Sequence, residues 1–227
     1  VMNFTANGLL AFGGSPVMAK EPKEATEMAA IADGVLINIG TMTEQDLKAF
    51  ILAGKKANER NIPVVLDPVG VSATPYRKQA VKKLLNEISF TAIKGNAGEI
   101  SYLAGVTWKT KGVESADGDT RQLVEIASQV ARKYDTISSI TGKVDMISDG
   151  EVTRQNESGH EMLTKITGAG CLLGSIITAC LAVGNSPLDD SFQAVQFYGE
   201  AAERAAKHPF VKGMGTFIPQ FIDELQN

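Results

Sequence analysis

Residues 34–69 read GVLINIGTMTEQDLKAFILAGKKANERNIPVVLDPV, and this stretch decides the class of fold. Two short apolar runs, Gly34–Ile39 and Pro63–Val69, flank a segment whose apolar residues recur at helical spacing. Thr43 stands before that segment and is a favourable N-cap residue. A strand, a helix and a second strand in this order are typical of parallel strands joined by a crossover helix. The stretch therefore predicts an α/β fold.

The alternation continues downstream and then changes. Short apolar or β-branched runs recur at Thr91–Ile93 and Thr136–Ile140, each reached through a helix-like segment. Beyond them, Val144–Ile147 and Glu151–Thr153 flank the turn residues Asp149-Gly150, which is the pattern of an antiparallel hairpin. We therefore expect a mostly parallel central sheet, flanked by helices, with a hairpin at its edge.

Helix signals are strong in the second half of the chain. The longest apolar helical regions run from Gly170 to Val183 and from Leu188 to Lys207, with turn residues between them. Earlier, Thr74 followed by Pro75 predicts the start of another helix. The stretch Thr110–Asp119 is rich in glycine and charge, so we interpret it as an exposed loop.

Composition limits the possible classes of protein. The chain has 227 residues, of which 44% are hydrophobic, and this is enough to bury one core. We therefore expect a single domain over residues 1–227. The net charge of −4 comes without a basic block, which argues against nucleic acid as a partner. No run approaches the about 20 apolar residues of a membrane span, and we expect a cytoplasmic protein. Cys171 and Cys180 lie about 13 Å apart along one predicted helix, too far for a disulfide.

The residues that follow the predicted strands are chemically informative. In an open parallel sheet, ligands bind outside the carboxyl ends of the strands. Small residues, a carboxylate, a cation and a glycine turn follow these ends, so we expect them to meet at one rim. We interpret the run Leu163–Ile166 as a further strand of this kind. In chain order, the segments that follow the strands are Asn38-Ile39-Gly40, Asp67-Pro68-Val69, Lys94-Gly95-Asn96, Thr141-Gly142 and Thr167-Gly168-Ala169-Gly170-Cys171.

The glycine turn Gly168-Ala169-Gly170 is the strongest single signal. It leads into an apolar helix, whose first N–H groups and dipole favour an anion such as phosphate. The alternative is a tight turn that binds nothing. A P-loop is disfavoured because the chain has no Gly-Lys-Ser/Thr ending. A dinucleotide fingerprint is disfavoured too, because helix and turn occupy the place of the next strand and its acidic residue.

Three charged residues at the predicted rim are candidate ligands for a metal ion or a phosphate. Asp67 ends an apolar strand and could hold hydrated magnesium, although a turn residue is the simpler interpretation. Glu99 lies in the first turn of a predicted helix and could serve the metal or merely complement the helix dipole. Lys94 could reach a nucleotide phosphate or could extend into solvent. His160 and His208 lack metal-ligand spacing.

The order of these motifs resembles that of ribokinase-like enzymes that phosphorylate vitamin precursors. Most members have aspartate after the second glycine, whereas this chain has Cys171, and in this it is similar to the hydroxyethylthiazole kinase family. The segments that carry the resemblance over nearly the whole chain are Asn3–Leu10, Gly14–Met18, Leu66–Gly70, Asn96–Glu99, Thr141-Gly142 and Lys165–Leu173. The family's leading strand and turn have no counterpart before Val1-Met2-Asn3, and in relatives that piece carries substrate contacts.

The resemblance implies a ribokinase-like kinase domain and a reaction. The family transfers phosphate from ATP, with Mg²⁺, to the primary alcohol of 4-methyl-5-(2-hydroxyethyl)thiazole in thiamin salvage, and its members are homotrimers with active sites between subunits. The resemblance implies that Met18 and Gly168 bind the substrate and that Asp67 and Glu99 bind magnesium. It implies ATP contacts by Thr141 and by Lys94, and relatives often have arginine at the position of Lys94. It assigns catalysis to the turn Gly168, Ala169, Gly170 and Cys171.

Two questions stay open at the level of sequence. Cys171 lies where a helix dipole can stabilise a thiolate, so it is either a base for the alcohol or a small apolar filler. Hydroxymethylpyrimidine phosphate kinase is the nearest alternative enzyme, and Cys171 in place of aspartate argues against it. A thiazole-binding protein without turnover is the alternative of another class.

Overall fold

The computed structural model describes residues 1–107 and 116–226, with the backbone alone for 116–119. Its described strands form one sheet in the order β1-β2-β3-β4-β5-β6. Strands β1 to β4 are parallel, and β5 and β6 add to β4 as an antiparallel hairpin at the edge. The strands are β1 (Val35–Asn38), β2 (Val64–Asp67), β3 (Ala92–Asn96), β4 (Ile137–Thr141), β5 (Asp145–Ser148) and β6 (Thr153–Asn156). The predicted α/β fold with a mostly parallel sheet is confirmed.

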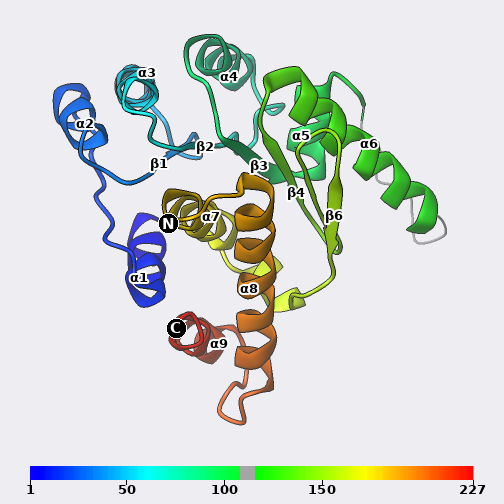
Figure 1. Cartoon of the computed structure of the whole chain (residues 1–227). Coiled ribbons are helices and arrows are strands. Elements are labelled where there is room, and N and C mark those ends of the chain that lie inside the picture. Colours follow the sequence, from blue (N-terminus) through cyan, green and yellow to red (C-terminus); the bar gives the residue numbers. More distant parts are fainter. Residues whose placement is uncertain (108–115, 227) are drawn as a thin grey trace.

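Helices cover both faces of this sheet (Figure 1). Helices α3 to α6 pack on one face, α7 and α8 on the other, and α9 packs outside α8. Their bounds are α1 (Met2–Phe12), α2 (Pro22–Ala29), α3 (Glu44–Glu59), α4 (Pro75–Glu87), α5 (Ala97–Ala104), α6 (Ala116–Tyr134), α7 (Ala169–Val183), α8 (Pro187–Lys207) and α9 (Met214–Asp223). Both cysteines are free. None of the helices in the described ranges is long and apolar enough to cross a membrane.

The central strands are apolar throughout because both of their faces are buried. Val64 and Leu66 of β2 pack toward α3 to α6, while Val65 between them packs toward α7 and α8. All three side chains are 0% exposed. A parallel sheet covered on both sides therefore explains why these runs show no alternation of polar and apolar residues.

Local capping fixes where two of the predicted helices begin. The Thr43 hydroxyl accepts from Asp46 N at 3.2 Å, and Asp46 Oδ2 accepts from Thr43 N at 2.8 Å. Likewise, Thr74 Oγ1 accepts from Arg77 N at 3.2 Å in front of the N1 residue Pro75. These caps satisfy N–H groups that have no partner within the helix. Both predicted helix starts are confirmed.

The run Leu163–Ile166 is not a strand, contrary to our interpretation. Glu161–Lys165 form a 3₁₀ helix, and Ile166 is its extended C-cap. The His160 ring accepts from Met162 N at 3.3 Å, so the segment satisfies its N–H groups locally rather than in the sheet. A run of four residues cannot distinguish a strand from a helical turn by periodicity. The glycine turn thus follows a short helix.

The edge hairpin forms as predicted, but its second strand starts later. Asp149 Oδ1 accepts from the backbone N–H groups of Glu151 and Val152, at 2.9 and 2.7 Å. This side-chain turn keeps both residues out of the ladder, so β6 begins at Thr153 rather than at Glu151.

The carboxyl-terminal end of the predicted loop Thr110–Asp119 is helical. Residues 110–115 lie outside the described residues, and 116–119 belong to α6. Further along α6, the side chains of Ile126, Ala127 and Val130 are buried, at 3% exposure or less.

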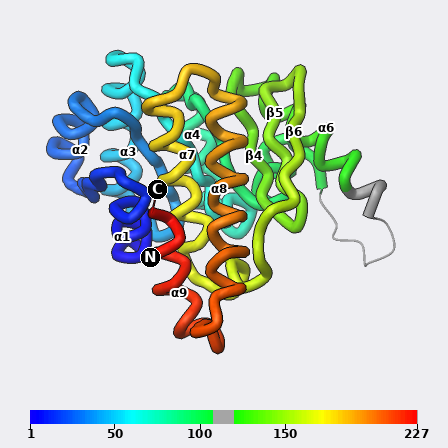
Figure 2. The backbone as a smooth tube through the Cα atoms, turned by 60° about the horizontal axis from the view of Figure 1, so that its bottom comes forward, coloured from blue at the N-terminus to red at the C-terminus, as the bar shows by residue number. Residues whose placement is uncertain are grey.

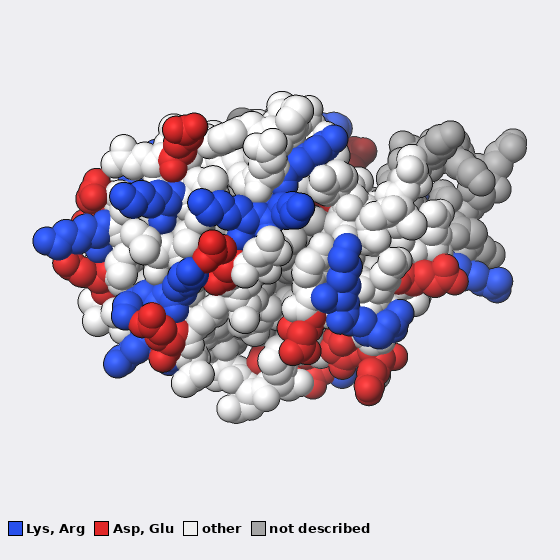
Figure 3. Space-filling view, turned by 90° about the horizontal axis from the view of Figure 1, so that it is seen from above, with Lys and Arg blue, Asp and Glu red and all other residues white. Residues whose placement is uncertain are grey.

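The outer face of α2, α3 and α4 carries mixed charge. Figure 3 shows basic and acidic side chains interspersed over this face. An ion pair between Lys55 of α3 and Glu87 of α4 spans the surface, and Lys78 lies 5.6 Å above the ring of Tyr102. These charges are solvated and paired, so the face has the character of an ordinary helical exterior.

Candidate active site

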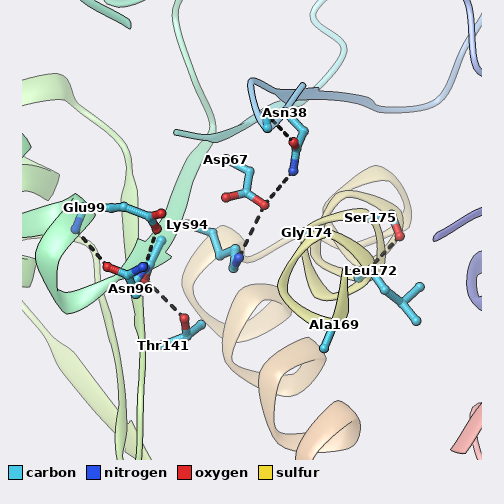
Figure 4. A network of polar contacts seen from close by, with 12 residues as sticks. Asn38, Asp67, Lys94, Asn96, Glu99, Thr141, Ala169, Leu172, Gly174 and Ser175 are labelled. Carbon is cyan, nitrogen blue, oxygen red and sulfur yellow. Dashed lines mark hydrogen bonds and ion pairs between the residues drawn. The ribbon is translucent and has the colours of Figure 1, made fainter. Parts of the chain in front are cut away.

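Polar side chains from several strand ends meet beside the start of α7, as the sequence predicts (Figure 4). Asp67 ends β2, Lys94 lies within β3, and Thr141 ends β4. Thr141 Oγ1 donates to the carbonyl of Gly95 at 3.3 Å, which ties the ends of β3 and β4 together. The parallel register brings these carboxyl ends to one edge of the sheet.

Asp67 is a buried carboxylate with one oxygen left unpaired. Its Oδ2 accepts from Asn38 Nδ2 at 2.8 Å and lies 3.4 Å from Lys94 Nζ. Its Oδ1 has no partner among the described residues. Burial raises the pKa of Asp67, and the Lys94 ammonium opposes that rise. A buried carboxylate oxygen without a donor is suited to a cation.

Lys94 is not a surface lysine. It is 4% exposed, and its ammonium pairs with Asp67, so the solvent-directed alternative is wrong. A Cβ added to Gly170 would lie 3.0 Å from Lys94 Nζ. The ammonium therefore sits between the carboxylate and the glycine turn, where it can contact an anion bound at the turn.

Glu99 both caps α5 and holds a neighbouring turn. Its Oε2 accepts from Asn96 N at 2.8 Å, in a capping box that Asn96 Oδ1 completes. Its Oε1 accepts from Gly70 N at 2.8 Å. Glu99 thus lies in the first turn of α5, as predicted, and in addition closes a capping box. Because each carboxylate oxygen has more than one lone pair, these two bonds leave Glu99 able to accept from a hydrated ion.

Arg77 organises the same rim, although no pattern in the sequence singles it out. From α4, its guanidinium donates to the carbonyls of Ile39 at 3.1 Å and Gly40 at 2.7 Å, and also to that of Val69. The Val69-Gly70 peptide is therefore held at its carbonyl by Arg77 and at its N–H by Glu99. A planar fork of donors can link two turns in this way.

The glycine turn leaves two donors free. Gly168 has φ +98°, a left-handed conformation that favours glycine. Ala169 N donates to Ile166 O at 3.3 Å, and Leu172 N donates to Gly168 O at 2.9 Å. Between them, the N–H groups of Gly170 and Cys171 have no acceptor among the described residues. Two adjacent free N–H groups at a helix start form an anion-binding site.

The Thr141-Gly142 turn is fixed by a carboxylate from the hairpin. Asp145 Oδ1 accepts from Gly142 N at 2.9 Å, and its Oδ2 accepts from Asn156 Nδ2 at 2.9 Å. Burial raises the pKa of Asp145, and these two hydrogen bonds oppose that rise. The edge hairpin therefore gives this turn a defined shape.

The two predicted substrate contacts have different surroundings: Gly168 begins the turn, whereas the Met18 side chain is exposed. Met18 is 44% exposed on the segment between α1 and α2. A Cβ built on Gly168 would meet Val1 at 3.2 Å and Phe4 at 3.5 Å instead. In the described chain, the start of α1 thus borders the turn.

The surroundings of Cys171 favour the second of the two interpretations, a small apolar filler. Burial raises the pKa of the Cys171 thiol, and the nearby Asp67 carboxylate raises it further. A hydrogen bond with Asn38 and the charge of Lys94 act in the other direction but do not reverse the rise. Burial and, after it, the carboxylate therefore favour the protonated thiol.

We expect iodoacetamide to alkylate Cys171 slowly at pH 7, with a rate that rises as the pH passes above 9. The thiolate is the nucleophile, and its fraction grows only above the raised pKa. Cys180 of the same helix, whose pKa burial raises to about 11, is the internal reference. Mass spectrometry of both peptides across pH measures the two rates. A Cys171 profile with its midpoint near or below pH 7 would contradict the protonated thiol.

The fold is that of ribokinase-like small-molecule kinases. Pyridoxal kinase of Staphylococcus aureus, solved in complex with ADP, matches with a TM-score of 0.62 at 17% identity over 92% of this chain and 85% of that one. Arabidopsis thaliana ribokinase matches with a TM-score of 0.56 at 18% identity over 93% of this chain and 60% of that one. At such identities the likeness concerns the fold alone.

The family is defined by closer matches. A model of the Hydroxyethylthiazole kinase family matches residues 1–227. Hydroxyethylthiazole kinase 1 of Oceanobacillus iheyensis is 51% identical over 226 residues, 99% of this chain and 87% of that protein. The structure of the hydroxyethylthiazole kinase protein from Pyrococcus horikoshii matches with a TM-score of 0.89 at 38% identity, over 99% of this chain and 83% of that one. The chain belongs to the hydroxyethylthiazole kinase family and is a kinase.

Proposed function

We propose that the strand-end site transfers the terminal phosphoryl group of ATP to the primary alcohol of 4-methyl-5-(2-hydroxyethyl)thiazole. The observation that carries this proposal is the arrangement around Asp67. Within the described ranges, a buried carboxylate with a free oxygen, a buried ammonium and two free N–H groups share one small region. Phosphoryl transfer needs a place for a cation and donors for the developing charge, and little else from the protein.

The proposed metal ligands are Asp67, through its free Oδ1, and Glu99. No cluster of three protein ligands forms among the described residues, so an ion here would take its remaining ligands from water and phosphate. When bound, Mg²⁺ would neutralise charge on the phosphates. Magnesium usually binds through one or two carboxylates in kinases, which fits this donor set.

The chain's own donors act on the transferred group and the nucleotide. We assign the N–H groups of Gly170 and Cys171, together with the Lys94 ammonium, to the transferred phosphoryl group. We assign the turn that begins at Thr141 to the nucleotide. Cys171 lies beside the reacting alcohol as a neutral thiol, and Gly168 borders the thiazole. Because the transition state is loose, a base for the alcohol contributes less than these donors.

A comparison of acceptors tests the choice of substrate. With ATP and Mg²⁺, we expect ADP release to depend on the thiazole alcohol and to be much slower with hydroxymethylpyrimidine phosphate. Faster turnover of the pyrimidine would favour the alternative kinase. Thiazole binding without ADP release would favour a non-catalytic binding protein.

We expect the protein to form a homotrimer with active sites between subunits. Apolar side chains are exposed along the amino-terminal helices and their connection, and burying them against another copy would be favourable. They are Val1, Met2, Leu10, Val17, Met18 and Ile31. A partner's Met18 segment at the glycine turn would explain why Met18 faces solvent in one chain. Light scattering that gives a monomer mass at all concentrations would refute this.

A cytoplasmic location stays a prediction of the sequence.

A further inference from the structure

The side chain of Tyr198 in α8 contacts the glycine turn at the start of α7. Its hydroxyl donates to the carbonyl of Ala169 at 2.7 Å, and its side chain is buried at 4% exposure. Helices α7 and α8 run side by side over one face of the sheet (Figure 2), so this contact joins the middle of α8 to the first residue of α7. The roles described above do not use Tyr198.

The bonded carbonyl shares a peptide unit with one of the free donors. The carbonyl of Ala169 and the N–H of Gly170 lie in one rigid plane. A hydroxyl that holds the carbonyl therefore also fixes the direction of the N–H at the other end. The Gly170 N–H is one of the two groups without an acceptor in the described chain.

We propose that Tyr198 is a positioning residue for phosphoryl transfer, which aims the Gly170 N–H at the transferred phosphoryl group by holding the Ala169–Gly170 peptide. The inference rests on the proposed role of the glycine turn. Hydrogen bonds in a chain polarise one another, so a donor on the carbonyl also makes the N–H a stronger donor. The benefit is largest when negative charge develops on the phosphoryl oxygens.

Aromatic packing prevents the hydroxyl from turning away. The Tyr198 ring meets Phe221 of α9 edge to face, with centroids 4.9 Å apart at 89°. Phe221 is itself stacked on Phe217 at 5.7 Å, and both are 0% exposed. Burial raises the pKa of Tyr198, so the phenol keeps its proton and remains a donor.

Loss of the hydroxyl should leave the fold in place. The Ala169 carbonyl has two lone pairs, and as the first residue of α7 it also accepts from the helix. Tyr198→Phe removes one oxygen and keeps the ring that Phe221 contacts. The consequence of the substitution should therefore appear in the rate of transfer rather than in folding.

The test compares two Tyr→Phe variants of the full chain. Tyr134→Phe is the matched control, because Tyr134 Oη donates to the Leu103 carbonyl at 3.3 Å on the other face of the sheet. For Tyr198→Phe we expect kcat with ATP, Mg²⁺ and the thiazole alcohol to fall about tenfold, a fraction of the effect of deleting an oxyanion donor. Both KM values should stay within about twofold, as expected for a contact that matters in the transition state. The control should keep the parent kcat.

Two further variants make each outcome decisive. Tyr198→4-aminophenylalanine keeps a donor at the same place, so its kcat should lie between those of the parent and Tyr198→Phe. A kcat for Tyr198→Phe within twofold of the parent, or no recovery with the amino variant, would overturn the inference. If Tyr198→Phe does not fold, the amino variant alone decides. Its amino group is a weaker donor than the hydroxyl, so the inference requires a kcat below that of the parent, and a kcat equal to that of the parent would overturn the inference. Gly170→Val separates the two proposals, since full activity there would refute the role of the turn itself.

Discussion

Replacement of Gly170 by valine is expected to lower kcat about a thousandfold or more, the scale of losing an oxyanion donor together with the space for the phosphate. A Cβ at this position would lie 3.0 Å from Lys94 Nζ, and the branched side chain would extend into the path of the phosphoryl group. Steady-state kinetics on the folded variant measure the effect.

Gly215→Val is the matched control for this substitution. Like Gly170, Gly215 is the second residue of its helix, and a Cβ there would meet nothing within 4 Å. The control should keep the parent kcat. A similar loss in both variants would mean that valine harms the fold rather than the anion site.

The neighbouring thiol should matter much less than the turn. Because burial and Asp67 raise the pKa of the Cys171 thiol, Cys171→Ala should retain measurable turnover. Cys171→Asp should be tolerated, since the resemblance implies aspartate at this position in most ribokinase-like vitamin kinases. The same kinetic assay ranks these variants above Gly170→Val. An alanine variant as inactive as the valine one would show that the thiol takes the alcohol proton.

Replacement of Asp67 by asparagine is expected to lower kcat by about a hundredfold or more and to leave thiazole affinity unchanged. The amide keeps the shape but not the charge that would hold magnesium at the free oxygen. The variant should also be destabilised by about 3–5 kcal/mol, because it leaves the Lys94 ammonium buried without its partner. Kinetics and urea unfolding measure the two effects.

A double variant separates stability from catalysis. In Asp67→Asn with Lys94→Met, both charges of the buried pair are gone, so the free energy of unfolding should recover most of the loss. The activity should not recover, because the proposed metal and phosphate contacts are both missing. If kcat recovered with stability, the magnesium assignment of Asp67 would be wrong.

The sequence predicted the sheet well because its evidence is local. Apolar runs such as Pro63–Val69 are long enough to mark strands, and Thr43 and Thr74 mark helix starts by bonds within three residues. The convergence of Asp67, Lys94 and Thr141 followed from the general rule that ligand sites lie at the carboxyl ends of parallel strands. The assignment of their particular roles came from resemblance.

The parts that the sequence missed depend on contacts between distant residues. Arg77 resembles a surface residue of a helix, and only the fold brings it to the carbonyls of Ile39 and Gly40. Tyr198 falls on the apolar stripe of α8, and nothing near it in the sequence points to Ala169, 29 residues away. The burial of Lys94 and the raised pKa of Cys171 likewise arise from tertiary packing.

Phosphorus NMR of one reaction mixture tests the central claim most directly. The purified chain is incubated with ATP, Mg²⁺ and 4-methyl-5-(2-hydroxyethyl)thiazole, beside a matched sample that contains a chelator of divalent metals. We predict a new phosphate monoester resonance that grows at the same rate as ADP, and neither signal in the chelated sample. ADP formed with inorganic phosphate instead of the ester, or ester formed equally well without divalent metal, would contradict a metal-assisted phosphoryl transfer at the Asp67 site.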